Sequence, residues 1–177
     1  MNKSGDTISE LVYDEEVVKF VQLWISSGKP CLTNGTGKYE KYLKTQDAEK
    51  VVRIFKDSLE VESYTVRELK NDTLYYKTDT KAHPKDGLKS FYNDLAKNID
   101  YPKISRLLGI EKKITIQFVV DEEGNLTDFV PLNDKSFNFE KKTIKRLEKM
   151  PRWIPATLNG KNVKTKFSIP LTFKMEP

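Results

Sequence analysis

The sequence predicts an α+β fold in which helices cover an antiparallel sheet, preceded by a small all-β hairpin module. Three observations predict this fold. Residues 1–80 carry short β-branched and aromatic runs separated by Gly, Asn and Asp turns. Residues 88–99 and 139–150 carry apolar side chains at helical spacing. Residues 113–120 and 163–173 alternate apolar and polar side chains, as half-buried strands do.

Composition narrows the class of protein. The chain has 177 residues, a formal net charge of +5 and 11% aromatic residues, which is typical of a globular protein of one or two domains. No Lys/Arg block is interleaved with aromatic residues, so we do not expect nucleic-acid binding. No apolar run approaches the roughly 20 residues that span a bilayer. Cys31 is the single cysteine, so no internal disulfide forms and the compartment cannot be inferred from cysteine usage.

The N-terminal half predicts strands joined by tight turns. The turns are SSGKP, TNGTG and KNDT, and their Gly and Asn residues favour hairpins. The apolar content is thin, so we expect this module to depend on another part of the protein. KAHPKDG then predicts a linker, which divides the chain into residues 1–80, a linker at 81–87 and a second domain at 88–177. The predicted strands are residues 17–25, 51–55, 59–66 and 74–77.

The second domain begins with two predicted helices. Residues 88–99 have a core-facing helical pattern, and Tyr101-Pro102 ends that helix because the residue before proline disfavours helix. Pro102 can open a second, short helix, which Gly109 closes. We expect the apolar residues of the short helix to face inward. They are Ile104, Leu107 and Leu108.

A hairpin and a third helix follow. Residues 113–120 and 126–132 predict two strands, joined by the turn DEEGN, in which Gly124 can adopt a positive φ. Apolar residues from Phe139 to Met150 predict a helix, and Pro151 stops it. Asn159-Gly160 then predicts a turn before the last strand.

The last strand carries the main functional question. From Val163 to Phe173 every second residue is apolar or Thr, and the other face is basic and polar. Pro170 has no N–H to donate, so it favours an edge strand with its nitrogen toward solvent. An edge strand can be guarded against pairing, can pair with a second copy of the chain, or can take up a foreign peptide. The residues alone leave these alternatives open.

The sequence gives little indication of a catalytic or metal-binding site. His83 is the single histidine, so neither a His-based triad nor a metal cluster has partners. The stretch GTGK lacks the Ser or Thr of a phosphate-binding loop, because Tyr39 follows it. A weak Ca²⁺ site at the acidic turn of residues 121–123 stays open, although a solvated turn is favoured. We therefore expect neither an enzyme nor a bound cofactor or metal.

Taken together, several motifs resemble the C-terminal domain of TonB proteins. They are FYNDLAKNIDYP, LLGIE, ITIQFVVDEEGNL, EKMPRWIPATLNGKNV and FSIPLTF, in the family's order, over about residues 87–173. Two small departures are Lys112 and Ala156, where the family usually has glycine. A larger departure is the lack of a membrane anchor and of a Pro-rich spacer. The polar opening MNKSGDTISE is not a signal peptide either, so we expect the anchor or signal to be missing from this chain.

The resemblance implies a non-enzymatic periplasmic protein that binds the extended TonB box of an outer-membrane transporter. The box adds as a strand beside the last strand, short of Pro170, in support of energy-coupled transport. Tyr101, Pro102 and Trp153 would support the surface, although the residues themselves favour a helix break at Tyr101-Pro102 and a core position for Trp153. The implied peptide-binding residues are Val163, Lys164, Thr165, Lys166, Phe167, Ser168 and Ile169.

The resemblance also implies further partners. Through a missing N-terminal anchor, the protein would contact the proton-driven motor of the inner membrane. Two alternatives remain: an orphan interaction module of the cell envelope without energy transduction, and a homodimer formed by edge pairing. Lys164 and Lys166 would steer an acidic segment or merely protect the edge.

Overall fold

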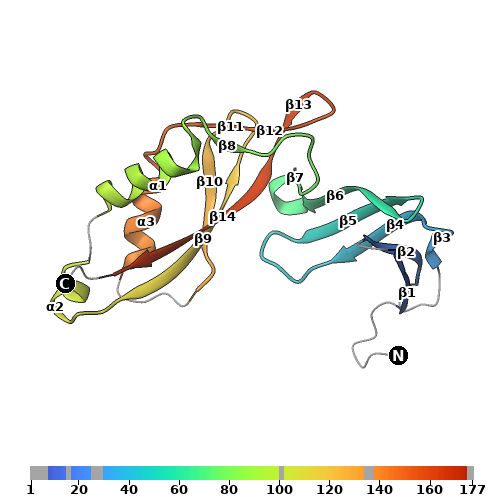
Figure 1. Cartoon of the computed structure of the whole chain (residues 1–177), viewed down its shortest axis with the longest axis horizontal. Coiled ribbons are helices and arrows are strands. Elements are labelled where there is room, and N and C mark those ends of the chain that lie inside the picture. The colour runs from blue at the N-terminus through green and yellow to red at the C-terminus, as the bar shows by residue number, and fades with distance from the viewer. Residues whose placement is uncertain (1–7, 15–16, 25–29, 100–101, 134–137, 175–177) are drawn as a thin grey trace. The chain divides into compact units, whose positions relative to one another are not determined.

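The computed structural model describes residues 8–14, 17–24, 30–99, 102–133 and 138–174. The chain divides into two units, Met1–Lys77 and Thr78–Pro177 (Figure 1). All strand pairs are antiparallel, and three α-helices occur among the described residues, in agreement with an α+β fold. Each unit is described by itself below.

The N-terminal unit is one sheet in which every strand pairs with the next along the chain. The order is β1-β2-β3-β4-β5-β6-β7. A short 3₁₀ turn, η1 (Glu68–Lys70), connects the last two strands. The strands are β1 (Ile8–Asp14), β2 (Val17–Trp24), β3 (Pro30–Thr33), β4 (Thr36–Tyr42), β5 (Glu49–Lys56), β6 (Leu59–Arg67) and β7 (Asp72–Tyr75).

The turn chemistry of this sheet explains its meander. Asn34 and Gly35, between β3 and β4, both have positive φ, as a two-residue hairpin turn requires. Asp57 and Ser58, between β5 and β6, do the same without a glycine. The sequence pattern predicts no strand at β1, β3 or β4. It predicts a turn over the whole of TNGTG, whereas only the Asn-Gly pair turns and the ends of this stretch belong to the strands.

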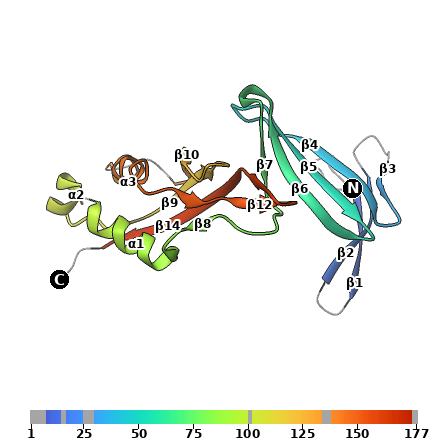
Figure 2. The same ribbon diagram turned by 90° about the horizontal axis from the view of Figure 1, so that it is seen from above.

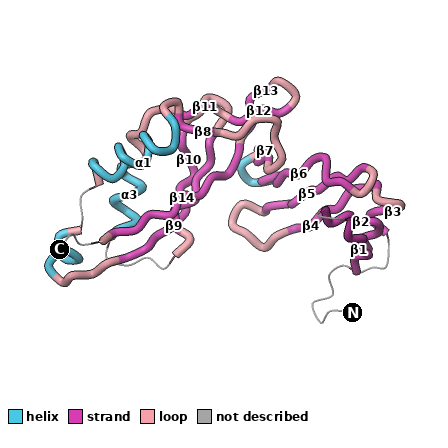
Figure 3. Tube along the Cα trace, viewed as in Figure 1, coloured by secondary structure: helices cyan, strands magenta, loops and turns pink. Residues whose placement is uncertain are grey.

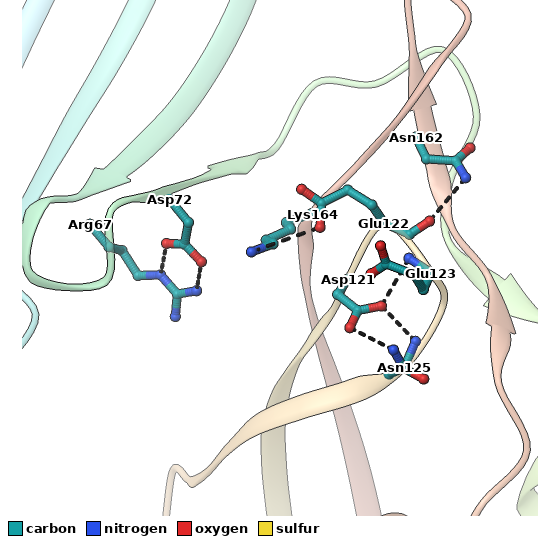
Figure 4. Close-up of polar contacts among 8 residues, drawn as sticks. All are labelled: Arg67, Asp72, Asp121, Glu122, Glu123, Asn125, Asn162 and Lys164. Carbon is teal, nitrogen blue, oxygen red and sulfur yellow. Dashed lines mark hydrogen bonds and ion pairs between the residues drawn. The ribbon is translucent and has the colours of Figure 1, made fainter.

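The interior of the N-terminal unit is thin and partly polar. Leu32 and Phe55 form a small buried cluster. Thr65 is fully buried, and its Oγ1 lies 2.8 Å from the hydroxyl of Tyr76. The guanidinium of Arg67, which is 3% exposed, donates to both carboxylate oxygens of Asp72 (Figure 4). Pairing makes burial of this charge tolerable.

The C-terminal unit combines a three-stranded sheet with helices. The sheet order is β10-β9-β14, and α1 and α3 lie side by side over it (Figure 3). Two short ladders, β8 with β11 and β12 with β13, complete the unit. The elements are β8 (His83–Pro84), α1 (Gly87–Asn98), α2 (Lys103–Leu107), β9 (Lys112–Val120), β10 (Leu126–Pro131), α3 (Phe139–Leu147), β11 (Trp153–Ile154), β12 (Ala156–Leu158), β13 (Lys161–Val163) and β14 (Thr165–Phe173).

One apolar core holds this unit together. The alternating residues of β9 point into it, as the sequence predicts, and α1 and α3 contribute from above. Two polar links tie the helices in place: Lys112 to Glu140 at 2.9 Å, and Arg146 to Asp94 at 2.6 Å. The core residues include Phe91, Leu95, Ile114, Ile116, Phe118, Val120, Phe139, Leu147, Trp153 and Ile169.

The short helix α2 corrects one prediction. Leu107 and Leu108 are 86% and 61% exposed, so they do not face inward. Instead Pro102 and Ser105 are buried. A helix of five residues has little more than one turn, so it can bury only one narrow face, and here the polar serine occupies it. Ile104 lies outside the residues whose side chains are described.

Residues 79–84, around the expected linker, are held within the C-terminal unit. His83 and Pro84 form β8, which pairs with Ile154 and Trp153 of β11. The backbone N–H of Asp79 donates to the carbonyl of Thr157 at 2.8 Å. Ala82 is 6% exposed and belongs to the core. These contacts anchor the first residues of the unit before α1 begins.

Candidate functional site

The last strand, β14, lies at a margin of the C-terminal sheet. It pairs with β9 from Thr165↔Val120 to Phe173↔Lys112 without a break in register, and the two strands run side by side in Figure 2. Within the described part of the chain, β14 has no strand on its other side. The sheet therefore offers an open edge along this strand.

The direction of the β14 backbone follows from Pro170. This residue stands opposite Thr115 in the ladder. Both backbone groups of Thr115 point away from β14. Its carbonyl accepts from the N–H of Leu132 at 2.9 Å, and its N–H donates to the Asn133 side chain. Pro170 is thus at a non-hydrogen-bonded position, facing the margin, where its missing N–H costs no ladder bond. By alternation, the backbone groups of Ser168 and Thr172 face the same way.

The side chains of β14 divide between a buried and a wet face. Thr165 and Ile169 are buried, and Phe167, Leu171 and Phe173 pack partly buried against the core. Ser168, Pro170 and Thr172 are exposed. Burial of alternate residues fixes the register, because a slip by one residue would exchange the two faces.

The structure interrupts the predicted long strand at Lys164. Val163 ends β13 and pairs with Ala156 in the hairpin around Asn159 and Gly160, whereas β14 begins at Thr165. Lys164 lies between the two strands, with its Nζ 3.8 Å from a carboxylate oxygen of Glu122 (Figure 4). Of the seven residues implied for peptide binding, Val163 and Lys164 therefore lie outside β14.

Trp153 is the supporting residue that the structure brings to the edge strand. Its ring stands edge to face against Phe167 of β14, with centroids 4.8 Å apart, and also against Phe91 and Phe118. It is 4% exposed, so it supports β14 from within the core and offers no surface for contact. Pro102 is buried directly before α2, so it does not lie on β14. Tyr101 lies outside the described residues.

The acidic turn before β10 is organised by its own hydrogen bonds (Figure 4). Oδ1 of Asp121 accepts from the backbone N–H groups of Glu123 and Asn125, and Oδ2 accepts from the Asn125 side chain at 2.9 Å. Gly124 has φ +83° and its carbonyl accepts from the N–H of Trp153 at 2.8 Å. The turn thus positions Trp153, and its Asp121 carboxylate is engaged internally.

The remaining chemical motifs do not converge on a site. His83 is exposed, and its Nδ1 lies 2.9 Å from the carbonyl oxygen of Lys81. The GTGK stretch lies at the start of β4, where Lys38 pairs with Glu40 at 2.8 Å. Among the residues with described positions, no cluster of three His, Cys, Asp or Glu side chains is arranged to hold a metal ion. None of the helices in the described ranges has the length and apolar character needed to cross a bilayer.

Comparison with known proteins finds a family match within the second half of the chain. A family model described as Gram-negative bacterial TonB protein C-terminal matches residues 97–175, which include α2, β9, β10, α3 and the whole of β14. A search of curated proteins finds no match. This family is a periplasmic protein-interaction domain. The match begins at residue 97, in the last turn of α1. Residues 97–175 of this chain therefore match the TonB C-terminal domain family.

Proposed function

We propose that the C-terminal unit takes up an extended peptide as an additional strand beside β14, and that this peptide is the TonB box of an outer-membrane transporter. The observation that carries the proposal is the open margin of β14, with backbone groups turned outward. Strand addition is a common way to recognise an extended peptide. The protein would act in the periplasm, without catalysis, in support of energy-coupled transport.

The peptide would lie alongside Val163–Ile169, with β14 contributing from Thr165 onward. Ser168 turns its N–H and carbonyl toward the margin and would form a pair of ladder bonds with the peptide. Pro170 ends the register because it has no N–H to donate. Exposed Ser168 and Pro170 leave room for the peptide backbone to approach.

The expected affinity is weak to moderate. Each backbone hydrogen bond contributes a net of about 1 kcal/mol. Association costs about 4–15 kcal/mol, so a handful of such bonds offsets only the low end of that cost. A pull along the strands would load several of these bonds together. The contact would therefore be short-lived at rest and yet able to transmit force.

The first test is titration of the chain with a synthetic TonB-box peptide, followed by backbone amide NMR. We expect shifts at Lys164–Ile169, and no shifts on β10, at the opposite margin of the sheet. Unchanged spectra at millimolar peptide would contradict the proposal. Sedimentation of the free chain belongs to the same experiment, because a homodimer paired through β14 would occupy the same edge.

A pair of proline variants tests the register. Ser168→Pro removes an outward N–H within the peptide-binding stretch, so we expect binding to weaken by about tenfold, since one bond of about 1–1.5 kcal/mol is lost. Thr172→Pro removes the equivalent N–H beyond Pro170 and should leave binding unchanged. Equal losses in both variants would show that the peptide is not placed as proposed. Circular dichroism of both variants monitors the fold.

A further inference from the structure

A basic groove lies where the C-terminal end of α1 meets α3, and it is separate from the β14 margin. The groove has a volume of about 540 Å³, and the lining residues that the structure describes include five cationic side chains and no acidic one. All five come from α3 and the turn that follows it. They are Lys141, Lys142, Lys145, Arg146 and Lys149.

Four of these charges are not neutralised within the described part of the chain. The charge of Arg146 is paired, because its Nη2 donates to Asp94 at 2.6 Å, and Asp94 also accepts from Asn98. Glu140, the buried acid of α3, pairs with Lys112 instead. The side chains of the four lysines form no ion pair or hydrogen bond with another described residue. Arg146 thus lines the groove with its charge paired to Asp94, and the four lysines supply the positive charge that is not paired among the described residues.

This arrangement is locally unfavourable for the helix. Lys141 and Lys145 are four residues apart, and so are Lys142 and Arg146, so like charges face each other along the helix surface. A face that served only solubility would be better with acidic residues at half of these positions. An anionic partner would relieve the repulsion and gain from every charge that it meets.

The spacing of the lysines favours an extended ligand. Lys141 and Lys145 are four residues apart on α3, so their side chains are about 6 Å apart along the groove, and Lys149 follows in the turn after the helix. In an extended peptide, alternate side chains lie about 6.6 Å apart on one face. An acidic residue at every second position would therefore meet one lysine after another.

The rest of the lining narrows the ligand class. Among the lining residues with described positions, Ile99 is the one apolar side chain, so they offer little to an acyl chain. None of the described lining residues carries an aromatic ring on which a sugar or a base would stack. Lysine is a compact point charge that pairs with single carboxylates, whereas planar bidentate recognition calls for arginine.

We propose that this groove binds an extended acidic segment of a protein partner, with acidic residues at alternate positions. The proposal does not rest on peptide binding at β14, because the groove is built from α1 and α3 alone. It gives the domain a second contact, in which charge speeds and orients association.

The test uses the full chain and a labelled peptide of alternating Glu and Thr, with a Gln-Thr peptide as the uncharged probe. Anisotropy titrations at low and moderate salt measure affinity. We expect binding of the Glu peptide only, weakened by salt, with NMR shifts confined to α3 and the end of α1. The triple variant Lys141→Gln, Lys145→Gln, Lys149→Gln should weaken binding by about tenfold or more at low salt.

A matched triple variant separates the groove from net charge. Lys89→Gln, Lys113→Gln, Lys161→Gln changes the chain's charge equally at exposed lysines elsewhere, and it should bind the Glu peptide as the parent does. Equal loss in both triples would overturn the proposal. A second result would also overturn it. In that case the Glu peptide does not bind, inorganic phosphate or anionic vesicles do bind, and the triple variant at Lys141, Lys145 and Lys149 abolishes that binding. The TonB-box titration, repeated on the groove triple, reports on β14 independently.

Discussion

The two units build their sheets in opposite ways. In the N-terminal unit each strand pairs with its neighbour in sequence, from β1 to β7. In the C-terminal unit β14 returns to pair with β9 after a hairpin, a helix and two short ladders have intervened. Local pairing needs only good turns, whereas distant pairing needs a core that brings the strands together.

Their interiors differ accordingly. The C-terminal unit has a continuous apolar core in which Phe118 contacts Trp153, Phe129 and Phe167. The N-terminal unit has a small apolar cluster and a buried ion pair. We infer that apolar packing stabilises the C-terminal unit. In the N-terminal unit, ladder hydrogen bonds and polar pairs contribute more of the stability. The edge strand of the proposed binding site is therefore placed on the better-packed unit.

The largest expected effect is on the aromatic core. Phe118→Ala should cost the C-terminal unit about 3–5 kcal/mol, because a fully buried ring with three aromatic neighbours leaves a cavity. Phe55→Ala, in the small N-terminal cluster, should cost less. Urea unfolding followed by far-UV circular dichroism and by amide NMR of each unit measures both. A greater loss from Phe55→Ala would reverse the comparison.

A buried ion pair gives the next effect, on the other unit. Asp72→Ala removes the carboxylate that pairs with the Arg67 guanidinium, whose side chain is 4% exposed. We expect a loss of about 3 kcal/mol, since an uncompensated buried charge is costly. Glu40→Ala breaks the exposed pair with Lys38 and should cost at most about 1 kcal/mol. Thermal unfolding of the two variants would contradict this if their losses were alike.

The smallest effect concerns the turn that positions Trp153. A Cβ at Gly124 would lie 1.9 Å from the Trp153 carbonyl oxygen, at φ +83°. Gly124→Ala should cost about 2–3 kcal/mol, because backbone strain and a clash add together. At Gly160, φ is +72° and nothing lies within 4 Å, so Gly160→Ala should cost about 1 kcal/mol from the backbone alone.

The thermal midpoint of the C-terminal unit measures both glycine variants. The difference between them isolates the close approach of the Asp121–Asn125 turn to β11. If both variants lost the same stability, the turn would not hold Trp153 against the sheet, and the support of β14 by this ring would need another source.

Much of the C-terminal unit could be predicted from local pattern. Helical spacing marked α1 and α3, alternation marked β9, and Gly124 marked the turn that follows. Leu107 and Leu108 show the limit of such patterns, because they are apolar and yet exposed. On a helix as short as α2, periodicity cannot show which face meets the core. The strands β1, β3 and β4 were missed because their residues mix turn formers with polar side chains.

The sequence by itself determined the alternation of β14 and, through Pro170, which of its residues turn away from a neighbouring strand. These are local properties of covalent structure, since proline has no N–H and side chains alternate in any strand. Only the tertiary structure decided that β9 is the neighbour, that the strand breaks at Lys164, and that the end of α1 lies beside Arg146 and the four lysines to form one groove. Those features join residues far apart in the chain, and only the burial of a shared core brings such residues together.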